Sequence, residues 1–76
     1  MYWINENETV KGTSRQVSFY CDTTSDIPNL PTSQASGVKQ GNNDVSCLPC
    51  GKGSSCLCIG DSSLWILNSS DVWTEV

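Results

Sequence analysis

The chain contains no histidine, a single alanine (Ala35) and only four basic residues among its 76 residues. Without histidine it lacks the side chain that most often acts as a general base near neutral pH and that most often binds metal ions. The formal net charge is −4, and no cluster of basic residues is present that could neutralise phosphates. The composition therefore argues against most enzyme classes and against nucleic acid as a partner.

Long apolar segments are also missing. No apolar run approaches the roughly 20 residues needed to span a bilayer. The first residues lack the basic start and the long apolar stretch of a secretory signal. We therefore expect a chain that does not act on a membrane and that stays in the compartment where it is made.

Residues that disfavour helices are abundant. Ser, Thr, Asn and Gly together supply 30 of the 76 positions, and their side chains or flexibility weaken helical hydrogen bonding. A domain of this size buries only roughly 60% of the surface of its unfolded chain, so its own core gives it little stability. We predict one small all-β domain over residues 1–76, a small antiparallel sheet with long irregular loops, which gains stability from outside.

The N-terminal part is predicted to form an arm and a strand. Residues 1–15 are the arm, with a short aromatic strand at its start. Residues 16–22 are the strand, because Val17, Phe19 and Cys21 alternate with polar residues at the period of a half-buried strand.

A Pro-, Ser- and Asn-rich loop is predicted over residues 23–46. Within it, Ile27 and Leu30 are expected to pin an extended segment, and the stretch 33–43 is expected to be mobile. A single helical turn that starts near Thr23, with Asp26 at its third position, is an alternative for the beginning of this loop.

The Cys-rich C-terminal segment, residues 47–76, carries the clearest strand pattern. Three strands separated by two polar turns predict an antiparallel meander. The strands are expected at residues 55–59, 64–67 and 72–76. The middle strand is apolar on both faces, so both faces are expected to be covered. In a chain this short, one of the covers is expected to be another protein.

Four of the five cysteines lie between residues 47 and 58, and their spacing allows a structural zinc site. The four candidate ligands are Cys47, Cys50, Cys56 and Cys58. The pair Cys47 and Cys50, followed by glycines, resembles a zinc knuckle, although the two pairs are closer together than in zinc ribbons. We keep zinc as an alternative and predict no metal and no cofactor.

The cysteines allow two further chemical interpretations. The sequence Cys47-Leu48-Pro49-Cys50 shares its Cys-x-Pro-Cys form with redox proteins, but no helix is visible that would lower the pKa of the first thiol. Disulfide bonds among five cysteines would leave one thiol unpaired. A cytosolic site of synthesis would also keep the thiols reduced. We expect Cys21, Cys56 and Cys58 to act as small apolar side chains.

Aromatic residues are the best candidates for contacts with a partner. Tryptophan fills thin cores, burying on the order of 200 Å² per residue, and it is also enriched in interface hot spots. We predict interface roles for Tyr2, Trp3, Ile4, Trp65 and Trp73. The arm at residues 2–4 is expected to dock by adding a strand to the edge of a partner's sheet.

The acidic residues show no catalytic pattern. Asp22, Asp26, Asp61 and Asp71 lie in predicted turns and caps, which explains them without a convergent pair of carboxylates. We therefore predict no catalytic residues and no enzymatic activity.

Two stretches of the sequence resemble small virion-associated proteins of tailed bacteriophages. The first runs from Phe19-Tyr20-Cys21-Asp22 through Asp26-Ile27-Pro28 to Leu30-Pro31. The second begins at Gly53-Ser54 and continues in the run from Leu64-Trp65-Ile66-Leu67 to Trp73. The resemblance covers residues 17–76, and the cysteine-rich stretch 47–58 departs from it.

This resemblance implies a non-enzymatic structural protein of the virion, made in the cytoplasm of a host bacterium. It would attach to the capsid as a decoration or accessory subunit and stabilise the shell, because it binds only the assembled form. Its partners would be the major capsid protein or other virion proteins, and repeated lattice sites favour a homo-oligomer. The alternatives are an accessory protein of the phage tail or fibre, and a small zinc-stapled binding module.

Overall fold

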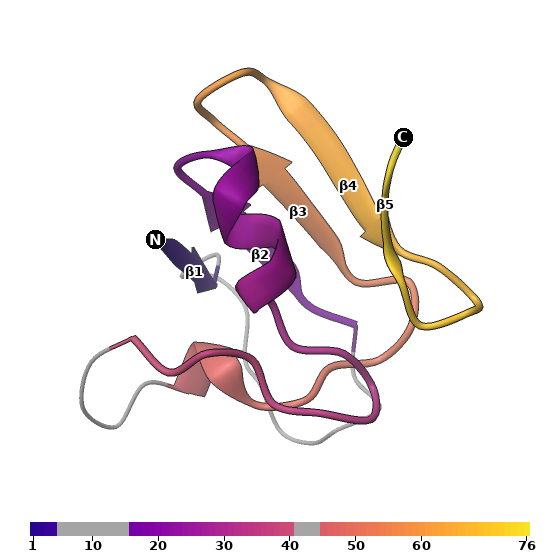
Figure 1. Ribbon diagram of the computed structural model, residues 1–76. Helices are drawn as coiled ribbons and strands as arrows, with labels where there is room; N and C mark the ends of the chain where they lie inside the picture. Colours follow the sequence, from indigo (N-terminus) through magenta and orange to yellow (C-terminus); the bar gives the residue numbers. More distant parts are fainter. Residues whose placement is uncertain (5–15, 41–44) are drawn as a thin grey trace.

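The computed structural model describes residues 1–4, 16–40 and 45–76, and it shows a five-stranded sheet with a short 3-10 helix lying over one face (Figure 1). In chain order the elements are β1 (Tyr2–Ile4), β2 (Ser18–Cys21), η1 (Thr24–Asn29), η2 (Val45–Cys47), β3 (Ser55–Cys58), β4 (Ser63–Leu67) and β5 (Trp73–Glu75). The strands lie in the order β1-β2-β3-β4-β5 across the sheet. The small all-β fold and the C-terminal meander of β3, β4 and β5 are confirmed.

One pair of neighbouring strands runs in the same direction. β2 and β3 are parallel, whereas the other three pairs are antiparallel as predicted. Parallel neighbours need a connection that returns from one end of the sheet to the other. The connection between β2 and β3 contains η1 and η2, and it places η1 over one face of the sheet (Figure 1).

We call the sheet face beneath η1 the inner face and the opposite one the outer face. The alternation predicted in β2 is present, because Phe19 and Cys21 are buried while Ser18 and Tyr20 are only partly buried. Phe19 packs edge-to-face against Tyr2 on one side and Trp73 on the other, with ring centroids 6.1 and 6.0 Å apart. The buried inner-face residues are Tyr2, Phe19, Cys21, Cys56, Cys58 and Leu67.

Helix η1 begins where the sequence allows a helical turn. The Thr23 N–H donates to the Asp26 carboxylate at 3.2 Å, and the Asp26 N–H donates to the Thr23 carbonyl at 3.1 Å. The Met1 ammonium donates to the same carboxylate at 2.6 Å. Ile27 and Leu30 are buried in the core, as expected of the residues that anchor this segment. The expectation that the segment is extended is wrong, because Thr24–Asn29 form a 3-10 helix.

The segment after η1 is held by hydrogen bonds as far as Gln40. The Gly37 N–H donates to the Cys47 carbonyl at 2.7 Å, and the Val38 N–H donates to the Asn29 carbonyl at 2.8 Å. The Tyr2 hydroxyl donates to the Val38 carbonyl at 2.8 Å. Residues 33–40 of the stretch expected to be mobile are therefore tied to the fold, and its residues 41–43 lie outside the described part, as do residues 5–15 of the arm.

Candidate interaction surfaces

The outer face of the sheet carries a row of five large side chains, of which four are exposed and Tyr20 is half-buried. The strand registers place Trp3, Tyr20, Leu57 and Leu64 opposite one another on four neighbouring strands, with Ile66 one step along. Trp3, Leu57, Leu64 and Ile66 are 37%, 38%, 45% and 39% exposed. Trp3 and Tyr20 contact each other, with ring centroids 6.1 Å apart. We call these five residues the outer row.

Among the residues that the registers of the five strands cover, no charged side chain interrupts the outer row. The other residues that the registers place on this face are Ser18, Ser55 and Thr74, which are small and uncharged. Exposed apolar patches of a few hundred Å² on small proteins often mark interaction sites. The outer face is therefore an uncharged surface with an apolar centre.

The aromatic triplet at the N-terminus divides between the two faces. Strand β1 pairs with β2, so alternate side chains point in opposite directions. Tyr2 is buried on the inner face, Ile4 is half-buried there, and Trp3 is exposed on the outer face. Of the three residues predicted for the arm interface, Trp3 alone presents a large exposed side chain in this structure.

The open edge of β1 is partly closed by a side chain. Met1 and Asp22 form a backbone hydrogen bond, so the alternating pattern of antiparallel pairs points the Tyr2 N–H away from β2. That N–H donates to the Gln40 side-chain carbonyl at 2.9 Å. An incoming strand would first have to displace Gln40 here.

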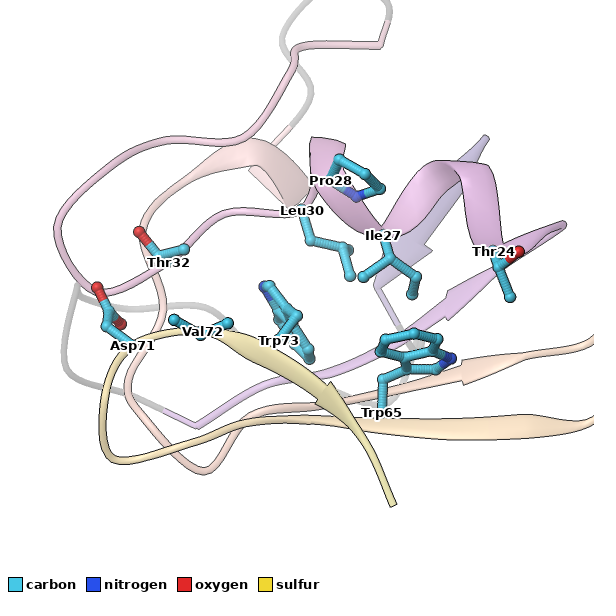
Figure 2. A pocket seen from close by; sticks show the side chains of 9 residues that line it. All are labelled: Thr24, Ile27, Pro28, Leu30, Thr32, Trp65, Asp71, Val72 and Trp73. Carbon is cyan, nitrogen blue, oxygen red and sulfur yellow. The ribbon is translucent and has the colours of Figure 1, made fainter.

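The two remaining tryptophans predicted as interface residues, Trp65 and Trp73, line a cleft of about 470 Å³ between η1 and the strands β4 and β5 (Figure 2). In Figure 2, Ile27 and Leu30 point toward the two indole rings, while Thr24 lies at one end of the cleft and Asp71 at the other. The full lining consists of Thr24, Ile27, Pro28, Leu30, Thr32, Trp65, Asp71, Val72 and Trp73.

Hydrogen bonds fix both indole rings of the cleft. The Trp73 indole N–H donates to the Pro31 carbonyl at 2.9 Å, and the Trp65 indole N–H donates to the Ser63 hydroxyl at 2.9 Å. Ser63 in turn donates to the Asp61 carboxylate at 2.7 Å. Both polar N–H groups are satisfied, so the rings offer the cleft their apolar faces.

A carboxylate stands at one end of the cleft because of the turn between β4 and β5. The Asn68 side-chain carbonyl accepts the N–H groups of Ser70 and Val72 at 2.9 and 3.1 Å, and Asp71 adopts a left-handed φ of 63°. The Asp71 carboxylate then accepts the Ser33 N–H at 3.0 Å. This backbone hydrogen bond lowers the pKa of Asp71, which keeps it charged at neutral pH.

The four cysteines of the alternative zinc site are not brought together. Cys56 and Cys58 lie on the inner face of β3, and the Cys50 thiol faces the Pro31 carbonyl at 3.6 Å. Within residues 1–4, 16–40 and 45–76, no three cysteine or acidic side chains are placed to share a metal ion. All five cysteines lie in these ranges, and none of them forms a disulfide.

The buried thiols are poor nucleophiles. Burial raises the pKa of Cys56 to about 11, and it also raises the pKa values of Cys21 and Cys50. Because the thiolate is the reactive form, these thiols stay protonated and inert near neutral pH. Cys21, Cys56 and Cys58 are completely buried in the core, where they pack as small apolar side chains.

The acidic side chains serve local structure, as their positions in the sequence suggest. Asp26 caps η1, Asp61 accepts the N–H and hydroxyl of Ser63 within its turn, and Asp71 holds Ser33. The hydrogen bonds from Ser63 lower the pKa of Asp61. Each of these three carboxylates has a partner that explains it.

The sequence indicates part of the outer row. Trp3 is predicted as an interface residue, and one face of the strand at residues 64–67 is expected to be covered by another protein. Sequence reasoning missed Tyr20 and Leu57. Leu57 lies between Cys56 and Cys58, so its opposite orientation follows from alternation along β3. Its alignment with Tyr20 requires the parallel pairing of β2 and β3, for which no local signal exists.

In comparisons with known proteins, no protein-family model, no curated protein and no solved structure matches this chain significantly. The described residues include no helix with the length and apolar character that crossing a bilayer requires.

Proposed function

We propose that this chain is a non-enzymatic structural subunit that binds a protein surface through the outer row. We further propose that this surface belongs to a tailed-phage virion, where the chain serves as a capsid decoration or accessory subunit. Its partner would then be the major capsid protein or another virion protein. The virion location rests on the resemblance of residues 17–76, whereas the mode of binding rests on the outer face.

The observation that carries the proposal is the uncharged row of exposed side chains across β1, β2, β3 and β4. Apolar surface contributes roughly 25 cal/mol per Å² when it leaves water, so a patch on the order of 400 Å² supplies about 10 kcal/mol. Association costs an estimated ~4–15 kcal/mol in lost freedom. A single contact of this size is therefore weak.

Weak single contacts suit a repeated lattice. Subunits that also touch one another at neighbouring lattice sites gain avidity from a high effective concentration, without any new contact to the shell. This argument supports homo-oligomeric contacts on the particle. An exposed sheet face also suits a second sheet that packs on it face to face.

The test is co-sedimentation with purified phage particles from the bacterium that carries the gene. The variant Leu57→Lys places a charge at the centre of the outer row, and we expect it to reduce the bound fraction at least about tenfold, since an unpaired charge is costly to bury. The matched control Val38→Lys changes an exposed apolar residue that is not part of the outer row and should bind like the wild type.

Two results would contradict the proposal. Absence of the chain from the particles, shown by mass spectrometry, would remove the virion location. Equal binding of Leu57→Lys and Val38→Lys would show that the outer row is not the binding surface.

A further inference from the structure

The open edge of β5 leaves backbone groups available for another strand. The Val76 N–H donates to the Leu64 carbonyl at 2.8 Å, and the Asn68 N–H donates to the Val72 carbonyl at 3.0 Å. Val72 and Val76 thus form hydrogen bonds to residues of β4 or next to it. Because hydrogen bonding alternates along an antiparallel strand, the N–H and C=O groups of Trp73 and Glu75 point away from β4. Among the described strands β5 is the last in the sheet, and no strand pairs with its outer side.

The cleft between η1 and β5 lies beside this open edge. The registers place the side chains of Trp73 and Glu75 on the inner face, where the cleft opens. A strand added to β5 would point every second side chain toward the same face, because side chains alternate along a strand. The walls formed by Ile27, Trp65 and Trp73 suit an aliphatic side chain.

Carboxylates flank the cleft. Asp71 closes one end, and Glu75 projects from β5 on the same face. The chain as a whole carries a net charge of −4. A ligand with complementary charge would carry basic residues on either side of the aliphatic residue that enters the cleft.

We propose that an extended segment of another polypeptide pairs with the open edge of β5, inserts an aliphatic side chain between η1 and the indoles of Trp65 and Trp73, and directs basic residues toward Asp71 and Glu75. This is strand addition, in which backbone hydrogen bonds provide affinity and a side-chain pocket provides specificity. The surface is separate from the outer row, so it does not depend on the function proposed above.

The test uses synthetic peptides and the full chain labelled with ¹⁵N. The probe is acetyl-KTLTK-amide, titrated at low salt while amide and indole signals are followed by NMR. We expect saturable shifts of the backbone amides of Trp73 and Glu75 and of the indole signals of Trp65 and Trp73. The amide signals of Tyr20 and Leu57, in the outer row, should remain in place.

Matched peptides separate the three parts of the interaction. Methylating the backbone nitrogens beside the leucine prevents strand pairing and should weaken binding by about tenfold, as should acetyl-KTGTK-amide, which has no side chain for the cleft. The acidic peptide acetyl-ETLTE-amide should bind several-fold more weakly, and this difference should shrink at high salt.

A pair of variants tests the edge from the side of the protein. Glu75→Pro removes an N–H that faces outward and leaves the bonds between β4 and β5 in place, whereas Glu75→Gln removes the charge and keeps the N–H. We expect Glu75→Pro to bind at least about tenfold more weakly than Glu75→Gln. If Glu75→Pro fails to fold, the methylated peptide on the unchanged chain decides the same question.

Three results would overturn this inference. They are equal binding of the methylated and unmethylated peptides, shifts confined to the outer row, and pairing of β5 with a second copy of the chain in the absence of peptide. The last would appear as concentration-dependent shifts of the Trp73 and Glu75 amides. Loss of peptide binding would leave co-sedimentation with particles unchanged, so the two proposals can fail separately.

Discussion

The two faces of this sheet have similar numbers of large side chains but very different surroundings. On the inner face, Phe19 contacts rings on both sides and lies beneath η1. On the outer face, Leu57, Leu64 and Ile66 are more than a third exposed, and the outer row carries no charge. A small domain has few residues with which to cover a sheet. In this chain the connection between β2 and β3, which contains η1, covers the inner face.

The contrast should be largest in the reactivity of the thiols. Cys56 and Cys58 on the inner face are completely buried, whereas Cys47 at the rim is half-buried. We expect iodoacetamide to label Cys47 in the native protein and to label the two inner-face thiols on the order of a thousandfold more slowly, because they need global unfolding. Mass spectrometry of timed digests measures these rates. Rapid native labelling of Cys58 would contradict a closed inner face.

Truncating one side chain on each face compares their contributions to stability. Phe19→Ala should lower the free energy of unfolding by about 3–5 kcal/mol, or prevent folding, because it removes the ring at the centre of the core. Leu57→Ala should change it by less than about 1 kcal/mol, since much of that side chain is already in water. Urea denaturation followed by circular dichroism measures both. Equal losses would mean that the outer row is covered within the chain itself.

The cover of the inner face can be disturbed by a substitution outside the strands. A Cβ atom added at Gly37 would lie 2.5 Å from the Asn29 carbonyl oxygen and 2.6 Å from the Tyr2 hydroxyl. Gly37→Ala should therefore cost about 1–3 kcal/mol, through a forced shift of backbone that packs over Tyr2. A control, Ser36→Ala, changes an exposed neighbour and should leave the denaturation midpoint nearly unchanged.

The smallest expected effect is a pH dependence at the start of η1. The hydrogen bond from the Met1 ammonium lowers the pKa of Asp26 and raises the pKa of the ammonium above its ordinary value of 8.0. The contribution of Asp26 is complete above its unfolded pKa of about 4 and is lost as the pH falls. That of the ammonium is complete below its unfolded pKa and is lost as the pH rises through the raised value.

Replacing the carboxylate should flatten both limbs of this profile. In Asp26→Asn the melting temperature should vary less between acid and alkaline pH than in the wild type. The control Asp22→Asn removes a more exposed carboxylate 3.6 Å from the ammonium and should retain most of the dependence. A wild-type profile in Asp26→Asn would exclude this ion pair as its source.

Local patterns predict most of the individual elements. Alternation identifies β2, the spacing of turns identifies the three strands of the meander, and Thr23 with Asp26 indicates the start of η1. Each of these signals lies within a few residues. The burial of Ile27 and Leu30 also follows locally, because they are the only large apolar side chains in a polar segment.

The candidate surfaces depend on pairings between distant residues. The outer row exists because β2 and β3 are parallel and in a register that aligns Tyr20 with Leu57, and the hydrophobic pattern does not encode that choice. The cleft likewise requires η1 to pack over Trp65 and Trp73. The sequence therefore indicates tryptophans as contact residues, but it does not indicate which neighbours join them.

The hydrogen bond from the Tyr2 N–H to Gln40 gives the sheet two unequal ends. A ribbon of stacked copies would need every molecule to be extendable on both sides, and here one side is obstructed by an amide side chain. Two copies joined through their β5 edges would present to the solvent only β1 edges, each partly closed by Gln40. A single glutamine thus disfavours the addition of further copies at the β1 edge.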